Sequence, residues 1–330
     1  MAKNEKQKQK LYRILEIMLK KTDEKHGLSI NELISELSEF GIKAERKSIY
    51  DDFLTLEEIG FPVSKLPTRP PKYYLEERIF ELAELKMLVD AIQSSKFITA
   101  AKSRDIIAKL EIFAGVHNSR ELSRQVYVED RIKTANTSAV YNVDAIHNAI
   151  NEGKKLSFMY FYYDREKRKV FRNSSKPYTV SPCALIWSEE NYYLVALDES
   201  ADVIKNFRVD KMQDAKVLDY PRKDDARVKK FNPADYSKRI FGMYGGREEL
   251  VTVECRENLA GAMIDRFGMD VLFQKTDFGF KFTTRLMVSP NFFAWVLGFG
   301  DEIRIVAPES LKDEFVEKIN KISKNYSGER

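Results

Sequence analysis

The hydrophobic pattern of this chain changes near Tyr141 from a helical to a strand-like period, and this change constrains the fold more than any other feature. Before it, apolar residues recur every three or four positions, as on one face of a helix. After it, short alternating runs separated by turn residues predict strands. A length of 330 residues is typical of two or three domains. The pattern therefore predicts an α+β multidomain protein.

Residues 1–75 carry the pattern of a winged helix-turn-helix domain. Apolar spacing predicts helices over residues 6–21, 29–40 and 44–59. Ser29-Ile30-Asn31-Glu32 has the form of a capping box at the start of the second helix. Two short extended segments follow around a proline-rich loop, as expected for a hairpin that forms the wing.

The next two segments are predicted to be a helical linker and a small β-barrel. Residues 76–140 are helix-rich and charged, which favours a linker or a dimerisation segment. Residues 141–220 begin with a short helix and continue with five strands at the regular spacing of a small barrel, the last over residues 203–209.

The remaining chain is predicted to form a connector and a separate C-terminal domain. Residues 221–248 are the connector. Residues 249–330 show the order β-α-β-β-α-β with an additional C-terminal helix, and the second strand is expected over residues 270–276. This order is that of a ferredoxin-like domain.

Composition and motifs exclude several classes of protein. No window approaches the ~18–20 consecutive apolar residues of a membrane span, and no apolar stretch near Met1 resembles a secretory signal. Two cysteines exclude a disulfide scaffold and suit a reducing cytoplasm. Three scattered histidines do not suggest a metal site. Because Gly-rich phosphate loops and Gly-x-Ser-x-Gly are absent, we expect no enzyme, no catalytic residue, no metal and no cofactor.

The first residues of the third helix are candidates for DNA contact. In a helix-turn-helix these residues reach base edges in the major groove. Arg and Lys donate hydrogen bonds to guanine, and Asp accepts one from cytosine. Ser forms hydrogen bonds with either a donor or an acceptor on a base edge. The candidate DNA-binding residues are Arg46, Lys47, Ser48, Tyr50 and Asp51, with Arg69 near the tip of the wing. The alternative is an ordinary three-helix bundle with a solvated face.

The small net charge of +4 conceals two local basic segments. The first 25 residues hold eight Lys and Arg against four acids, and residues 151–176 hold eight against three. Aromatic residues from Phe158 to Phe171 interleave with the second segment. Such a mixture suits a site where bases stack and phosphates are neutralised. Alternatively, the aromatic residues belong to the core and the cations to a solvated hairpin.

Three segments in order resemble the WYL-domain transcriptional regulators of bacteria. The family tripeptide Trp-Tyr-Leu corresponds to Tyr192-Tyr193-Leu194, with Tyr in place of Trp. Ser181-Pro182-Cys183-Ala184-Leu185 is similar to the family's Pro-x-x-Leu strand, and Phe207-Arg208-Val209-Asp210-Lys211 to its Phe-Arg-x-Asp-Arg. The recognition segment from Arg46 to Asp52 also resembles the family's, with Asp51 where an Arg is common.

The resemblance implies an N-terminal winged helix, an SH3/Sm-like WYL barrel and a ferredoxin-like WCX extension. It also implies that the barrel senses a nucleic acid or a nucleotide-like molecule. The implied effector-binding residues are Tyr160, Arg172, Ser181, Tyr192, Tyr193, Arg208 and Lys211. Among them Arg208 suits a bidentate phosphate clamp. Its alternative role is a salt bridge to an acid such as Asp210.

The leading hypothesis is a cytoplasmic, homodimeric regulator that binds a double-stranded operator through the winged helix and a single-stranded nucleic acid or nucleotide effector at the barrel. The alternative is a single-stranded nucleic-acid-binding adaptor whose winged helix contacts another protein. An enzyme acting on nucleotides is a third reading. None of the three involves a membrane.

Overall fold

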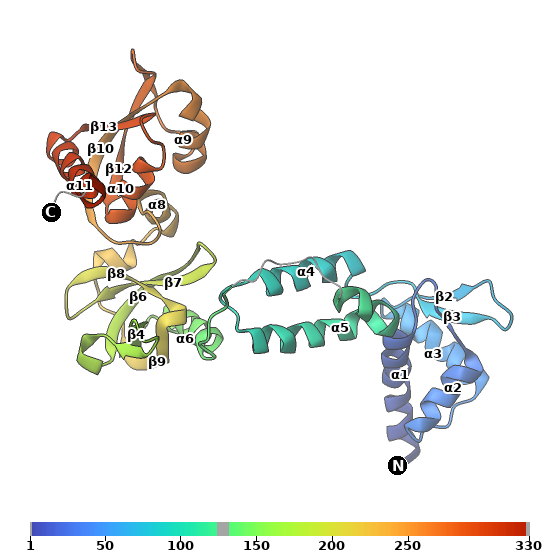
Figure 1. The fold of residues 1–330 in the computed structure, drawn as a ribbon. Coiled ribbons are helices and arrows are strands. Elements are labelled where there is room, and N and C mark those ends of the chain that lie inside the picture. Colours follow the sequence, from blue (N-terminus) through green and yellow to red (C-terminus); the bar gives the residue numbers. More distant parts are fainter. Residues whose placement is uncertain (1, 124–131, 328–330) are drawn as a thin grey trace. The chain divides into compact units, whose positions relative to one another are not determined.

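The computed structural model describes residues 2–123 and 132–327. The chain divides into two compact units, Met1–Thr137 and Ser138–Arg330. Part of the expected linker, residues 124–131, and the end of the expected C-terminal domain, residues 328–330, lie outside the description. Figure 1 shows the helices and strands of both units.

The first unit begins with three helices and a small antiparallel sheet. The helices are α1 (Ala2–Lys21), α2 (Ile30–Glu39) and α3 (Arg46–Glu58). The strands are β1 (Leu28–Ser29), β2 (Val63–Leu66) and β3 (Lys72–Leu75), in the order β1-β3-β2. The expected capping box is confirmed, because the Glu32 amide donates to Ser29 Oγ and the Glu32 carboxylate accepts from the Ser29 amide.

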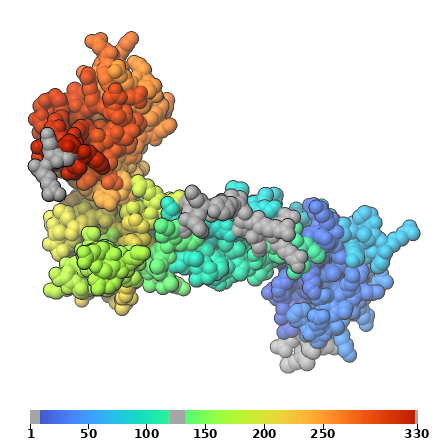
Figure 2. Space-filling view, in the orientation of Figure 1, coloured from blue at the N-terminus to red at the C-terminus, as the bar shows by residue number. Residues whose placement is uncertain are grey.

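The core of this part comes from one apolar face of each helix. Ile14, Leu33 and Ile49 are buried there, one from each of α1, α2 and α3. The β2–β3 hairpin projects from the helices, which leaves its tip exposed (Figures 1 and 2). Helix packing therefore fixes α3 while the hairpin stays accessible beside it.

Two further helices complete the first unit. They are α4 (Leu82–Ser94) and α5 (Ala100–Ser123), which pack on each other through Leu85, Val89 and Ala114. Gly115 interrupts α5 with a φ of +77°, and a Cβ there would lie 3.0 Å from the Lys20 carbonyl oxygen of α1. This close approach, which only glycine allows without strain, seats α5 against the end of α1.

The second unit begins with α6 (Ala139–Asn151) and a six-stranded antiparallel sheet that curves into a half-barrel. Its strand order is β5-β4-β6-β7-β8, and β9 pairs with β4. The strands are β4 (Lys154–Tyr163), β5 (Lys169–Phe171), β6 (Tyr178–Ser188), β7 (Asn191–Asp198), β8 (Val203–Arg208) and β9 (Met212–Pro221).

The strand β9 is the element that the sequence pattern missed. We expected the last strand of the barrel over residues 203–209, yet Met212–Pro221 forms a further strand. Apolar and polar residues alternate only weakly along β9, so the sequence shows no clean strand pattern. The backbone is also irregular, because Asp214 adopts a φ of +56°. The strand forms because its distant partner β4 satisfies its backbone groups.

A connector and a second sheet complete the unit. The connector contains α7 (Ala226–Lys229) and α8 (Pro233–Arg239), and Tyr236, Ile240 and Met243 pack against β6 and β7. The C-terminal elements are β10 (Arg247–Cys255), α9 (Ala260–Phe267), β11 (Gln274–Lys275), β12 (Phe280–Val288), α10 (Pro290–Leu297), β13 (Ile303–Ala307) and α11 (Glu309–Ser327). The antiparallel sheet has the order β11-β12-β10-β13.

The expected strand over residues 270–276 is wrong for most of its length. Only Gln274–Lys275 pairs, with Lys281 and Phe280 of β12. Gly268 ends α9 with a φ of +93°, and the chain between them forms no ladder. The apolar residues Val271 and Phe273 pack against the core without forming a strand, which explains the misleading pattern.

Candidate nucleic-acid-binding sites

The exposed face of α3 carries four of the six candidate DNA-contact residues. Ile49, Phe53 and Leu56 turn to the core at positions i, i+4 and i+7. The opposite face of the helix therefore presents Arg46, Lys47, Tyr50 and Asp51 to solvent. The sixth candidate, Arg69, lies in the exposed turn between β2 and β3.

The β2–β3 hairpin supports Tyr50 directly. The Tyr50 hydroxyl lies 3.2 Å from the Tyr73 hydroxyl of β3, and the two rings meet edge to face with centroids 6.0 Å apart. The Tyr50 ring also meets Phe53 of the core. Tyr50 is therefore held by neighbours while 37% of its surface stays exposed.

Ser48 has a different environment from its neighbours. Lys10 of α1 is only 7% exposed and donates to Ser48 Oγ. The same ammonium pairs with Asp52 at 2.6 Å. Burial raises the pKa of Asp52 against the opposing effect of Lys10. Ser48 thus belongs to a polar contact between α1 and α3, separate from the exposed row.

A cavity of about 630 Å³ opens in the half-barrel, and we call it the cationic cavity. Eight aromatic side chains line it: Tyr160, Phe161, Tyr162, Tyr163, Tyr178, Tyr193, Phe207 and Tyr244. Four cationic residues line it as well: Arg172, Lys205, Arg208 and Lys211. Glu189 is the one carboxylate among the described lining residues. The cavity combines positive charge with aromatic surface.

Arg208 is held in one orientation by a buried acid. Its Nε and Nη2 donate to the two carboxylate oxygens of Asp210, each at 3.0 Å, and Asp210 is 3% exposed. Nη2 also donates to Asn191 Oδ1 at 2.9 Å. Burial opposes the charge of Arg208, but Asp210 outweighs it and raises the pKa of the guanidinium. The alternative role of Arg208, a salt bridge to Asp210, is therefore confirmed. Its Nη1 atom has no hydrogen-bond partner within the described chain.

Arg172 has aromatic neighbours instead of an acidic partner. Its guanidinium carbon lies 5.9 Å from the Tyr160 ring centroid and 5.5 Å from that of Tyr162. Among residues 2–123 and 132–327 no carboxylate pairs with it. Its backbone amide donates to the Tyr160 carbonyl oxygen at 2.8 Å, which attaches the segment after β5 to β4. Arg172 is therefore an exposed cation available to a ligand.

Five of the seven predicted effector residues line this cavity: Tyr160, Arg172, Tyr193, Arg208 and Lys211. Tyr160 accepts a hydrogen bond from the Arg208 amide at 3.1 Å, and burial raises the pKa of its hydroxyl. The Lys211 ammonium lies 4.7 Å from the Tyr163 ring centroid and 3.6 Å from Asp210. The structure brings these residues together from β4, β7, β8 and the turns beside them.

The other two predicted residues lie elsewhere. Ser181 is fully buried, donates to Glu199 at 2.6 Å and accepts from the Lys223 amide at 2.7 Å. Tyr192 meets Trp187 edge to face at 4.6 Å between ring centroids. Neither residue lines the cationic cavity.

The connector supplies lining residues that sequence reasoning did not name. Gly242, Met243, Tyr244 and Gly245 belong to the cavity wall. Asn206 of β8 holds this segment, because its Nδ2 donates to the Met243 carbonyl oxygen at 2.9 Å and its Oδ1 accepts from the Tyr236 hydroxyl at 3.0 Å. No local signal could have found these residues, since they lie more than thirty positions after β8.

The cysteines and acidic residues offer little for nucleophilic or metal chemistry in the described parts of the chain. Burial raises the pKa of the Cys183 thiol to about 11 and that of Cys255 to about 12, so both stay protonated near neutral pH. No group of three or more His, Cys, Asp or Glu side chains could hold a metal ion within residues 2–123 and 132–327. No helix in those ranges is long and apolar enough to cross a membrane.

Comparison with known proteins identifies two domains. Residues 141–217 match the WYL domain and residues 247–323 match the WCX domain. None of the curated proteins matches the chain.

Two solved structures are similar over most of the chain. Proteasome accessory factor B/C (PafBC) of Arthrobacter aurescens is 17% identical with a TM-score of 0.25; the match covers 94% of this chain and 46% of that one. A CRISPR Cas-related protein is 14% identical with a TM-score of 0.40, over 90% of this chain and 78% of that one. The chain thus spans less than half the length of the first of these proteins.

Proposed function

Because this chain belongs to the family of WYL-domain regulators, we propose that it is a cytoplasmic DNA-binding transcriptional regulator whose half-barrel binds a nucleic-acid or nucleotide-like effector. Effector binding at the cationic cavity would change the DNA affinity of the N-terminal domain. Such a change is a coupling free energy between two distinct sites. In this proposal the chain acts by binding and catalyses no reaction.

We assign the first elements of the chain to a winged helix-turn-helix domain. The order α1, α2, α3 followed by the β2–β3 hairpin supports this assignment, and so does the sheet order β1-β3-β2. We likewise assign the C-terminal domain to a ferredoxin-like fold on the sheet order β11-β12-β10-β13, with α9 and α10 as its two crossing helices. In the first assignment α3 is the recognition helix.

The observation that carries the effector proposal is the composition of the cationic cavity. Four cations lie among eight aromatic rings, and Arg172 has no acidic partner in the described residues. Phosphates are recognised by Arg and Lys, and bases stack on aromatic side chains. A nucleotide or a single strand requires both kinds of contact, so the cavity matches this class of ligand.

The DNA proposal is tested with the double variant Lys47→Ala/Tyr50→Ala. We expect it to lose binding to duplex DNA selected by the wild-type protein while its circular dichroism still shows a folded protein, because neither side chain belongs to the buried core of the first unit. Lys321→Ala removes a 72% exposed lysine from α11 and serves as the control. Unchanged duplex affinity in the double variant would contradict the assignment.

A single-stranded nucleic-acid-binding adaptor is the second candidate, favoured by the same aromatic and cationic cavity. In that case the winged helix contacts a protein. The two candidates differ in one measurement: the adaptor binds single strands tightly and selects no duplex sequence, whereas the regulator enriches a defined duplex site from a random pool. Selection with and without an added oligonucleotide separates them.

We also propose that the protein is a homodimer joined through α4 and α5. Met87 is 73% exposed and Ile112 is 54% exposed, and a dimer interface on these helices would cover both side chains. A two-fold dimer would match a palindromic operator. Sedimentation tests this proposal: the wild type should sediment as a dimer and Met87→Asp/Ile112→Asp as a monomer. A wild-type monomer at high concentration would contradict it.

A further inference from the structure

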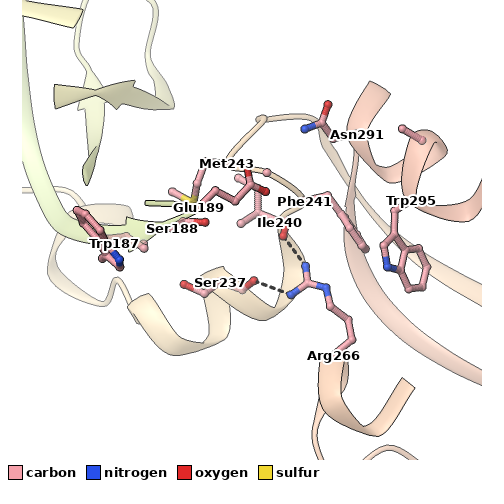
Figure 3. Close-up of a pocket in the computed structure, with 13 residues that line it drawn as sticks. Trp187, Ser188, Glu189, Ser237, Ile240, Phe241, Met243, Arg266, Asn291 and Trp295 are labelled. Atoms are coloured by element: carbon pink, nitrogen blue, oxygen red, sulfur yellow. Dashed lines mark hydrogen bonds between the residues drawn. The ribbon is translucent and has the colours of Figure 1, made fainter. Parts of the chain in front are cut away.

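A second cavity, drawn in Figure 3, lies within the second unit and shares lining residues with the cationic cavity. Its volume is about 580 Å³, and we call it the tryptophan cavity because Trp187 and Trp295, the two tryptophans of the whole chain, both line it. The end of β6 forms one side, the connector after α8 forms another, and α9 and α10 complete it.

Aromatic neighbours hold both indoles in place. The Trp295 ring lies 5.1 Å from the Phe241 centroid and 5.2 Å from that of Phe299. Trp187 packs on Tyr192 and remains 51% exposed. Indole rings that neighbours hold in place make good stacking surfaces, because little side-chain entropy is lost when a planar group binds.

The cation of the tryptophan cavity already has partners. Arg266 donates to the Ile240 carbonyl oxygen at 2.5 Å and to that of Ser237 at 3.4 Å, at the end of α8 (Figure 3). Its guanidinium carbon lies 4.6 Å from the Phe241 ring centroid, and burial lowers its pKa. Arg266 thus caps a helix end. The other polar side chains of the lining, Ser188, Glu189, Ser237 and Asn291, are neutral or acidic and suit the edge of a base more than a phosphate.

The two cavities share a wall made by Glu189, Gly242 and Met243. There is no room for a side chain at Gly242, because a Cβ there would lie 2.3 Å from Asn291 Nδ2 and 3.4 Å from Glu189 Oε1. A carboxylate in this wall disfavours a phosphate but accepts a hydrogen bond from an amino or hydroxyl group.

We propose that a single ligand occupies both cavities, with its phosphates on the cations of the first and one base against the indoles of the second. This inference rests on the proposed function, and it specifies that function further. The effector must carry a base as well as phosphate, and its base must contribute to affinity. The Glu189 carboxylate would accept a hydrogen bond from the sugar or from the base where the ligand crosses the shared wall.

The test uses tryptophan fluorescence, which reports on this cavity because the chain has no other tryptophan. The wild-type protein is titrated with a single-stranded hexanucleotide, as DNA and as RNA, and with a matched abasic hexamer. We expect the two normal hexamers to change the fluorescence. The abasic hexamer should bind at least roughly 5- to 150-fold more weakly without that change, because the base that stacks on the indoles is lost together with the others.

Two variants test whether the contribution of the base to affinity comes from the tryptophan cavity. Trp187→Ala, at a half-exposed position, should reduce the affinity for the normal hexamer toward that for the abasic one and leave the abasic affinity unchanged. Trp295→Ala should do the same if it folds, which its circular dichroism shows. Tyr326→Ala removes an 88% exposed aromatic residue from α11 and is the matched control.

The possible results separate this inference from the proposed function. If the abasic hexamer binds more weakly and Arg172→Ala weakens binding, but fluorescence stays constant and Trp187→Ala binds the normal hexamers as the wild type does, then the tryptophan cavity takes no base. In that case the inference is wrong while the effector proposal stands. If no hexamer binds at micromolar concentration, the proposed effector class is wrong and the inference fails with it. Preference for the RNA or the DNA hexamer identifies the source of the strand.

Discussion

Arg208 and Asp210 form an ion pair with two hydrogen bonds, both of 3.0 Å, on the wall of the cationic cavity. The acid is buried and the Arg208 side chain is 40% exposed, so the acid orients a cation that a ligand can still reach. A guanidinium held in this way loses little freedom when it binds a phosphate.

This relationship predicts that stability and ligand binding respond differently to substitution. Arg208→Ala should destabilise the protein by about 1–3 kcal/mol, because it removes two charged hydrogen bonds from the buried Asp210 carboxylate. The double variant Arg208→Ala/Asp210→Ala should recover most of that stability but not the affinity for a single-stranded oligonucleotide. Denaturant unfolding and a binding titration measure the two effects. Recovery of affinity in the double variant would exclude a direct role for Arg208.

Two neighbouring arginines allow a matched comparison of charge. Arg172 lines the cationic cavity, whereas Arg168 pairs with Asp164 at 3.0 Å in the β4–β5 hairpin. Arg172→Ala should weaken oligonucleotide binding by roughly 10- to 150-fold and lower the slope of log affinity against log salt by about 0.7. Arg168→Ala removes the same charge and should have little effect. Equal losses in the two variants would mean that the cavity has no special role.

The polar contact between α1 and α3 should control the stability of the first unit. Lys10→Ala leaves the partly buried Asp52 without its cation and is expected to cost about 1–3 kcal/mol. Lys10→Met/Asp52→Leu replaces the pair by apolar groups and should be close to the wild type in stability. Thermal unfolding measures both variants. A neutral Lys10→Ala would show that the pair contributes nothing.

The buried Ser181–Glu199 contact gives a prediction for pH. Burial raises the pKa of Glu199, but hydrogen bonds from Lys155 and Ser181 outweigh it and hold the pKa below the ordinary 4.5. A lowered pKa in the folded state stabilises the protein above pH 4.5, and this contribution is lost as the pH falls through the folded-state pKa. Glu199→Gln should therefore flatten the stability profile below pH 4.5 and lower stability at neutral pH.

Ser181→Ala provides the companion measurement. It should reduce stability at neutral pH and leave oligonucleotide affinity at the wild-type value, because Ser181 does not line the cationic cavity. Weakened binding at unchanged stability would return Ser181 to the group of effector-binding residues that the family resemblance implied.

Local pattern was enough for the elements whose partners are near in sequence. The capping box at Ser29 follows from four consecutive residues, and the buried face of α3 follows from helical spacing alone. The resemblance to WYL-domain regulators, carried by short segments such as Phe207-Arg208, is confirmed by the matched domains. Strand β9 and the unpaired stretch before β11 were mispredicted, because distant partners decide them.

The sequence by itself determined which residues could meet a nucleic acid: it placed a basic segment beside aromatic residues and identified the family. Only the tertiary structure decided how they are used. Ser181 and Arg208 are both polar residues in family motifs, yet one is buried against Glu199 and the other is exposed beside Asp210. Likewise, Trp187 and Trp295 are more than a hundred residues apart and line one cavity. The physical reason is that strand pairing and core packing join distant segments, and these contacts leave no local trace in the sequence.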